Sequence, residues 1–325
     1  MAYFAARGNI DPEGHNGATE TSWACTGCFK CRESCDHRNP VAATLFDARA
    51  EWMERGAAPD GAKRVVERFP LHWQETHDAV NAIADRLVTS TSAACETSVL
   101  LGCTYAKRLP VEARNAAIAC SKLVPGGVRL INECCGAPLR MAGDSQGFRT
   151  QAERFQASLG SAKRVVVVDA GCARTLRDDY PAMHVGLGVK VDLFVDLAAA
   201  NIAKLQQIAT DEPLRYHDPC QLARGLGVTE PPRAVMAQIT GKPVGEFDDN
   251  RRAANCSGAG GLLPITMPKV ASKIAANRVA EHAAQGGGRI VTACASSLLK
   301  FRAQGAQADD IATWVARSLG AETTE

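Results

Sequence analysis

Short apolar runs alternate with longer amphipathic segments through the last two thirds of the chain. Residues 98–101, 128–131 and 164–168 are mostly apolar runs of strand length. Between them, residues 108–123 and 147–159 carry apolar positions at helical spacing. This alternation predicts parallel strands joined by right-handed helical crossovers.

The same alternation occurs again after residue 211, so we expect an internal repeat. The strands and helices predicted for the repeat are 214–217, 231–239, 244–247, 270–284, 289–292 and 309–319. A strand at 189–195 and an Ala-rich helix at 197–208 would complete the first unit. The fold class is therefore α/β, with Rossmann-like parallel-sheet domains at 95–210 and 211–325.

The first third of the chain has a helical pattern instead. Apolar residues repeat at helical spacing from about residue 39 to 92, and residues 90–94 form a candidate linker. Residues 1–20 are polar and predict an arm or a partner-binding segment. Among the aromatic residues and histidines here, we interpret Trp52, Trp73, His72 and His77 as helix packing or solvent-exposed side chains. Residues 1–94 are thus expected to form an arm and a small helical domain.

Composition narrows the function classes. The chain has 325 residues and a net charge of +2, so it lacks the basic excess of a nucleic-acid-binding protein. No apolar run has the length needed to cross a bilayer, and the N-terminus has no basic segment leading into an apolar one. We expect a cytoplasmic protein without a transmembrane segment of its own, either free or held at the inner face of a membrane through a partner.

Thirteen cysteines are the unusual feature of the composition. An odd number in a long chain without an export signal argues against a disulfide scaffold. Four of them form a C-x2-C-x2-C-x3-C run: Cys25, Cys28, Cys31 and Cys35. This spacing is typical of a bacterial ferredoxin [4Fe-4S] cluster, whereas zinc sites usually separate two C-x2-C pairs by a dozen or so residues.

The fourth ligand of this cluster is less well defined. Asp36 follows the last cysteine where ferredoxins have proline, and no second run is present to exchange a ligand with the first. Either Cys35 completes its own cluster, or a distant residue such as Cys95 or His37 does.

The remaining motif cysteines follow the predicted strands. Cys103, Cys134 and Cys172 end the first three strands, and Cys135 follows Cys134 directly. In the repeat, the corresponding cysteines are Cys220, Cys256 and Cys294. Because ligands bind beyond the carboxyl ends of parallel strands, we expect these thiols to converge. Soft thiolates suit iron–sulfur clusters and zinc.

With these residues in view, the chain resembles the cysteine-rich CCG-domain proteins. That family includes heterodisulfide reductase catalytic subunits and iron–sulfur subunits of glycolate, lactate and anaerobic glycerol-3-phosphate oxidation systems. The resemblance covers nearly the whole chain and implies a ferredoxin-like part followed by two CCG domains. The family motif is Cys, then Cys-Cys-Gly, then Cys-x-x-Cys, and in heterodisulfide reductases each such motif holds a non-cubane four-iron cluster with five cysteines.

Matched to that motif, the chain keeps the spacing but loses thiols. The first motif has Asp169 where the family has a cysteine, and the resemblance implies a cluster of cubane or variant type with Asp169 as an oxygen ligand. The second motif has Ser257 and Ser297 at two cysteine positions. It would hold a cubane with serine or substrate at the open iron, or it would be empty, its cysteines being small buried hydrophobes. Cys95 and Cys120 fit no motif and are interpreted as structural.

Other motif signals are weaker. No nucleotide-binding glycine fingerprint follows a strand. Gly136 and Gly258 are instead expected to let the backbone approach a cluster and donate N–H bonds to its sulfur atoms. His217 and Arg224 match the family pattern beside Cys220. They would supply a proton or a positive charge at the second site, or they would bond to backbone.

These residues predict an iron–sulfur electron-transfer subunit of a multi-subunit oxidoreductase. Electrons would pass between the N-terminal [4Fe-4S] cubane and a cluster held by Cys103, Cys134, Cys135 and Cys172. The partner subunits would supply a flavin, another metal centre or a membrane quinone site. Two alternatives stay open: a thiol–disulfide reductase of the heterodisulfide reductase type, and a cluster-less or zinc-binding assembly module.

Overall fold

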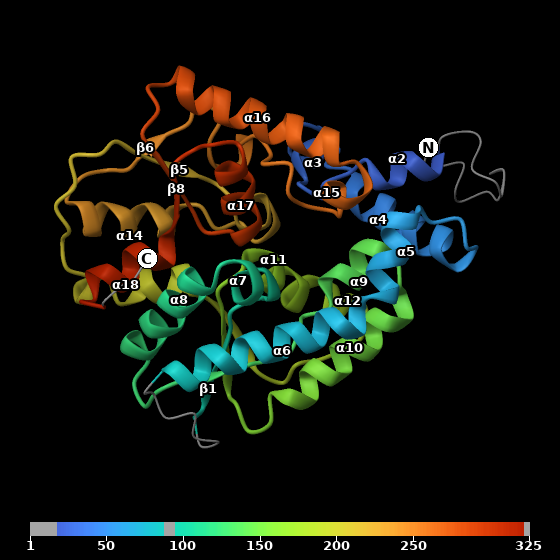
Figure 1. Cartoon of the computed structure of the whole chain (residues 1–325), viewed down its shortest axis with the longest axis horizontal. Coiled ribbons are helices and arrows are strands. Elements are labelled where there is room, and N and C mark those ends of the chain that lie inside the picture. The colour runs from blue at the N-terminus through green and yellow to red at the C-terminus, as the bar shows by residue number, and fades with distance from the viewer. Residues whose placement is uncertain (1–17, 88–94, 322–325) are drawn as a thin grey trace.

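The computed structural model describes residues 18–87 and 95–321, and its N-terminal part is helical (Figure 1). The helices are α2 (Ala18–Trp23), α3 (Lys30–Glu33), α4 (Val41–Glu54), α5 (Asp60–Glu67) and α6 (Phe69–Arg86). On α6, the buried residues are Phe69, Thr76, Val80 and Ile83, so the helical spacing predicted here is confirmed at Val80 and Ile83. The candidate linker at 90–94 and most of the predicted arm lie outside the described residues. A ferredoxin-like fold for this part stays a prediction.

The first sheet has the strand order β2-β1-β3-β4, and all of its pairings are parallel. Its strands are β1 (Thr97–Leu100), β2 (Arg129–Leu130), β3 (Arg164–Val167) and β4 (Lys190–Leu193). Val99 lies opposite Leu130 on one side and Val166 on the other. The order reverses between β1 and β3, which is the switch point where open α/β sheets bind ligands.

Helices connect and cover these strands. They are α7 (Cys103–Arg108), α8 (Pro110–Leu123), α9 (Ala137–Ala142), α10 (Ser145–Ser158), α11 (Ala170–Arg174), α12 (Tyr180–Ala182) and α13 (Phe194–Ala200), with a π-helical turn at Thr175–Asp179. Helix α10 begins before the predicted residue 147, because the Asp144 carboxylate accepts a hydrogen bond from the Gly147 N–H and caps the helix. The helix predicted at 197–208 instead begins directly after β4. It ends at Ala200 and is followed by a 3₁₀ turn at Ile202–Lys204.

The second sheet repeats the topology of the first, with the parallel order β6-β5-β7-β8. Its strands are β5 (Leu214–His217), β6 (Gly245–Glu246), β7 (Arg289–Thr292) and β8 (Ala308–Asp310). Its helices are α14 (Glu230–Thr240), α15 (Leu263–Thr266), α16 (Pro268–Ala284), α17 (Ala295–Ala303) and α18 (Ile311–Ser318), with a π-helical turn at Gln221–Gly225 and a 3₁₀ turn at Arg251–Ala253. The predicted pair of parallel sheets and the internal repeat are confirmed.

The repeat differs from the prediction in α15 and α17, which were not predicted, and at its final helix. The final helix was expected to start at residue 309, but residues 308–310 form β8, which pairs with β7. The Asp310 carboxylate then accepts a hydrogen bond from the Ala312 N–H and caps α18. The strand depends on pairing with a distant segment, so the local apolar pattern does not reveal it.

The two α/β units share one hydrophobic core. Buried residues of both sheets, such as Val99 and Val291, belong to the same cluster, and α8 packs against α18. A smaller cluster forms around Trp23 and Trp52 and connects the N-terminal helices to Ala142 of α9. Figure 1 shows α6 running along the first unit, with α2, α4 and α5 at one end of the molecule. In residues 18–87 and 95–321, no helix is both long enough and apolar enough to cross a membrane.

Candidate metal centres

Four thiols meet at the carboxyl end of the first sheet, and we call them the first centre: Cys103, Cys134, Cys135 and Cys172. Cys103 begins α7 after β1, Cys134 and Cys135 follow β2, and Cys172 lies on α11 after β3. The Sγ atoms of Cys135 and Cys172 are 3.2 Å apart. Cys134 and Cys135 are buried, each with 1% of its surface exposed. The predicted convergence of sulfur atoms from three strand ends is therefore present.

Two glycines allow this close approach. Gly136 has φ 77°, which a tight turn after two cysteines requires, and its N–H donates to Cys134 Sγ at 3.5 Å. Gly102 has φ 99°, and a Cβ at this position would lie 2.9 Å from the Cβ of Asp169. A side chain at Gly102 would push the loop that carries Cys103 away from Asp169 and Cys172, and one at Gly136 would press on Phe148 and Gln151 of α10.

The thiols of the first centre share protons. The pKa of Cys103 is lowered well below its usual value by a hydrogen bond with Cys134, and that of Cys135 by hydrogen bonds with Cys134 and Cys172. The pKa values of Cys134 and Cys172 are raised well above the usual value, since these thiols donate to the neighbouring thiolates and are buried. Two thiolates are thus already favoured, and thiolates are the form that binds metal.

Asp169 lies beside this centre in a helix-capping position. Its Oδ1 accepts hydrogen bonds from the N–H groups of Gly171 (2.8 Å) and Cys172 (3.1 Å). Burial raises the pKa of its carboxyl group to about 6. One of its oxygens is therefore engaged by α11, and its role as an oxygen ligand stays a prediction.

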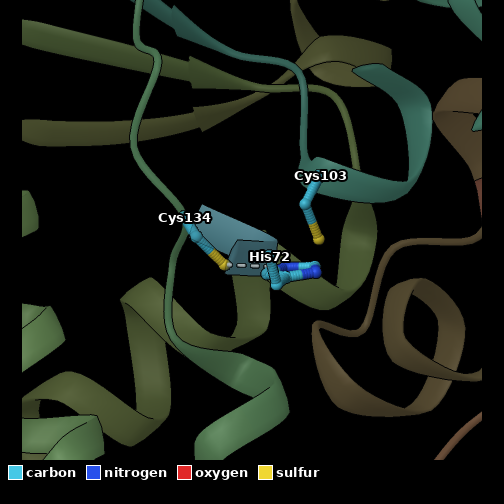
Figure 2. Close-up of side chains that lie close together, drawn as sticks. All are labelled: His72, Cys103 and Cys134. Atoms are coloured by element: carbon cyan, nitrogen blue, oxygen red, sulfur yellow. Dashed lines mark hydrogen bonds between the residues drawn. The ribbon is translucent and has the colours of Figure 1, made fainter. Parts of the chain in front are cut away.

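His72 is a site residue that the sequence interpretation missed. Its Nε2 lies 3.8 Å from Cys134 Sγ, and the ligand atoms of His72, Cys103 and Cys134 all lie within 4.8 Å of one another (Figure 2). It stands on α6, where its ring stacks on Phe69. No spacing rule connects a helical histidine to a cysteine at a strand end, so the sequence carries no signal for this contact.

Three thiols form the second centre: Cys220, Cys256 and Cys294. Cys220 follows β5, Cys294 precedes α17 after β7, and Cys256 accepts a hydrogen bond from the Gly258 N–H at 3.3 Å. Burial raises the pKa of Cys220 to about 11 and that of Cys294 to about 12. These two are therefore neutral thiols in the metal-free chain.

The two serines of the second motif bond to each other. Ser257 Oγ and Ser297 Oγ are 2.8 Å apart, and both residues are buried. Each hydroxyl thus has a protein partner. The second centre therefore offers three thiols and two hydroxyls that are hydrogen-bonded to each other.

The N-terminal cysteine motif packs against the second centre. Cys28 and Cys256 are within hydrogen-bonding reach, and this hydrogen bond is the main reason that the pKa of Cys28 falls to about 5. Cys256 Sγ also lies 3.5 Å from Thr26 Oγ1. Gln221 Nε2 donates to the Gly27 carbonyl at 3.0 Å, and Arg224 Nε donates to the Cys28 carbonyl at 2.5 Å.

The other candidate ligands of the N-terminal motif differ in placement. Cys31 is exposed, and the pKa of Cys35 is lowered by N–H groups of its own loop, at Asn39, His37 and Arg38. Cys95 is buried at the amino end of β1, away from the edge where the thiols converge, which argues against it as a distant ligand. Cys120 is buried within α8, where burial raises its pKa to about 12, as expected for a structural thiol.

Arg224 and His217 are both held by the protein. The Arg224 guanidinium also donates to the carbonyls of Arg252 (2.9 Å) and Ala254 (2.7 Å). His217 is buried, packs edge-on against Phe301 and accepts from Arg278 Nε at 3.4 Å. Burial lowers its pKa well below the usual value. These contacts favour the backbone-bonding alternative for Arg224 and a packing role for His217.

A cavity of about 240 Å³ separates the two centres. Cys103, Cys135 and Cys172 line one side of it, and Cys220 and Cys294 line the other. Apolar residues, among them Met141, Leu262 and Ile265, form much of the remaining wall. Both centres therefore face one shared cavity.

The donor set tests whether an iron–sulfur group fits. At the first centre, four thiols converge in a buried place with an imidazole beside them and a backbone N–H aimed at one sulfur. This soft, hydrogen-bonded set suits an iron–sulfur cluster. The N-terminal motif also supplies four thiols in cluster spacing. The second centre has fewer soft donors and fits such a group less well.

Comparison with known proteins agrees with this geometry. The family model for the CCG cysteine-rich domain matches residues 97–177 and 214–302. The chain belongs to the CCG cysteine-rich domain family. Each match contains the thiols of one centre, so the two centres are those of two CCG domains.

Curated relatives carry iron–sulfur and oxidoreductase names. A fumarate reductase (CoM/CoB) subunit of Methanothermobacter marburgensis is 28% identical over 270 residues, which are 79% of this chain and 52% of that protein. The chain thus spans about half the length of that relative. A dihydromethanophenazine:CoB–CoM heterodisulfide reductase subunit of Methanosarcina mazei is 25% identical over 92% of this chain and 78% of its own length. Lactate utilization protein A of Bacillus licheniformis is 25% identical over 45% of this chain and 65% of its own length.

Proposed function

We propose that the chain is an electron-transfer subunit of a multi-subunit iron–sulfur oxidoreductase. When bound, iron–sulfur clusters supply one-electron chemistry with potentials from about −700 to +450 mV. The packing of the N-terminal motif against Cys256 supports this best, because Cys256 Sγ lies 3.5 Å from Thr26 Oγ1 and within hydrogen-bonding reach of Cys28. Several relatives are named as subunits of oxidoreductases, so we propose partner subunits that carry a flavin, another metal centre or a quinone site.

The position of the N-terminal motif changes the expected order of the route. The sequence predicted exchange between that motif and the first centre, but the thiol in contact with Cys28 belongs to the second centre. We therefore propose that electrons enter or leave the CCG domains beside Cys256 and reach Cys103, Cys135 and Cys172 along the wall of the shared cavity. Arg224 supports this junction by holding the Cys28 carbonyl.

The cavity is the observation that favours a second function, thiol–disulfide reduction. It is largely apolar and lined by thiols of both centres, as a site for a small disulfide would be. Against it, Ser257 and Ser297 leave the second centre short of thiols on this wall. We therefore rank electron transfer first.

Redox cycling of the anaerobically purified chain separates these functions. We expect the visible absorption of the protein to bleach on chemical reduction and to recover with a one-electron acceptor, without consumption of a small disulfide. Sustained turnover of the disulfide would favour the reductase. Iron and acid-labile sulfide near zero would favour the cluster-less or zinc-binding assembly module instead.

A further inference from the structure

His72 reaches the first centre from outside the CCG domain. It lies on α6, before the matched range 97–177, and its Nε2 is 3.8 Å from Cys134 Sγ (Figure 2). The Phe69 ring stacks on the imidazole with centroids 5.6 Å apart and fixes its plane. The imidazole is half-buried, so its interaction with the thiols is only partly screened by water.

Lys107 determines which imidazole nitrogen carries the proton. Lys107 Nζ lies 3.2 Å from His72 Nδ1 and 2.5 Å from Glu75 Oε2, which keeps the ammonium in place. An ammonium group can only donate hydrogen bonds, so Nδ1 must accept. The proton of the neutral ring is then on Nε2, the nitrogen that faces Cys134.

The same contact argues against His72 as a metal ligand. Ligation through Nε2 would require the proton on Nδ1, where it would face the Lys107 ammonium, and two donors would then oppose each other. A hydrogen bond from Nε2 to sulfur satisfies both ring nitrogens at once. Lys107 lies on α7, the helix that Cys103 begins, so the same helix carries a thiol of the first centre and the ammonium group that orients His72.

We propose that His72 donates a hydrogen bond from Nε2 to the Cys134 sulfur, once this thiol has lost its proton on binding the cluster, and so raises the reduction potential of the first centre. This inference rests on the proposed function, since it concerns an iron–sulfur group held by these thiols. Reduction adds negative charge to such a group, and an N–H donor at a ligating sulfur stabilises that charge. Lys107 is a positioning residue, because it fixes the tautomer of His72 without touching the thiol.

An EPR-monitored redox titration of the full, iron-loaded chain tests the proposal. The His72→Phe variant keeps an aromatic ring on Phe69 but loses the N–H, and the first centre should become harder to reduce. At the parent's midpoint potential, we expect its reduced-to-oxidised ratio to fall about tenfold, equivalent to about 59 mV for a one-electron couple. The His72→Gln variant restores an N–H donor at similar reach and should titrate close to the parent.

His77 supplies the matched control. It lies on the same helix, its ring is tilted against Trp73, and its Nε2 lies 3.5 Å from Asn132 Nδ2 rather than beside a thiol, so His77→Phe should leave the potential unchanged. An unchanged potential in His72→Phe, with the iron of the first centre retained, would overturn this inference and leave the proposed function standing. If both His72 variants lost that iron while His77→Phe kept it, His72 would be a ligand, which contradicts the hydrogen-bond assignment. A parent chain without iron at the first centre would overturn the proposed function there, and this inference with it.

Discussion

The first and second centres place the same kind of residue pair at the same point of the same fold, yet the pairs differ chemically. Cys135 and Cys172 face each other with 3.2 Å between their sulfur atoms. In the second domain, Ser257 and Ser297 face each other with 2.8 Å between their oxygen atoms. Each pair joins the loop after the second strand of its sheet to the helix after the third.

This comparison shows that the repeat preserves positions while the donors diverge. Sulfur atoms in contact are soft donors open to metal, whereas the two hydroxyls are hard and neutral and are held to each other by one hydrogen bond. At another position it is the first domain that has lost the thiol: Asp169 stands where the second domain has Cys294. Compared with the family motif, the first centre thus lacks the thiol at Asp169, and the second lacks the thiols at Ser257 and Ser297.

The largest expected effect comes from making the two centres alike. Combining Ser257→Cys with Ser297→Cys gives the second domain the thiol pair of the first, and we expect additional bound iron of about one cluster after anaerobic reconstitution. The reciprocal change, Cys135→Ser with Cys172→Ser, should remove the iron of the first centre. Iron and sulfide content of both variants measures the exchange. If the serine-to-cysteine variant bound no further iron, donor chemistry alone would not explain the difference.

The next largest effect is expected on removal of Arg49, which holds the N-terminal part against both domains. This fully buried guanidinium donates to the carbonyls of Ser22, Cys25, Met141 and Gly261, which belong to the N-terminal part and to both domains. Removing it in Arg49→Met leaves several buried carbonyls without a donor. We expect the free energy of unfolding to fall by about 3 kcal/mol, measured by chemical denaturation.

Asp47 provides the control for Arg49 on the same helix. Its ion pair with Arg140 is 2.9 Å long, but its side chain is 71% exposed, so solvent screens the interaction. Asp47→Ala should therefore change the free energy of unfolding by less than about 0.5 kcal/mol. Equal losses in the two variants would mean that the buried guanidinium has no special role in holding the N-terminal motif against the second domain.

The contact between the two domains should respond to pH through Asp310. This buried carboxyl group accepts a hydrogen bond from Tyr105 of the first domain, and burial raises its pKa to about 7. The folded chain thus keeps this proton between about pH 4 and 7 while the unfolded chain releases it, so stability falls as pH rises through that range. The free energy of unfolding should therefore fall by about 2 kcal/mol less between pH 5 and 8 in Asp310→Asn than in the parent. An unchanged slope in urea unfolding would contradict this assignment.

The sequence predicted the sheets and the thiol convergence because both follow from local signals. Apolar runs mark the strands, and parallel strands necessarily bring the residues at their carboxyl ends to one edge. Contacts between distant segments were not predictable in this way. Strand β8 is short and pairs only with β7, and His72 has no spacing relation to Cys134. The meeting of Cys28 and Cys256 depends on how the N-terminal loop packs, which periodicity does not encode.

Iron content with EPR spectra of the parent chain and of Cys134→Ala, both purified anaerobically, decides whether the first centre holds a cluster of its own. We predict about eight iron atoms in the parent, about four in the N-terminal motif and about four in the first centre. Cys134→Ala should lose about four of these and keep the signal of the N-terminal motif unchanged. A parent with only about four iron atoms, or a variant that lost both signals together, would contradict an independent cluster at the first centre.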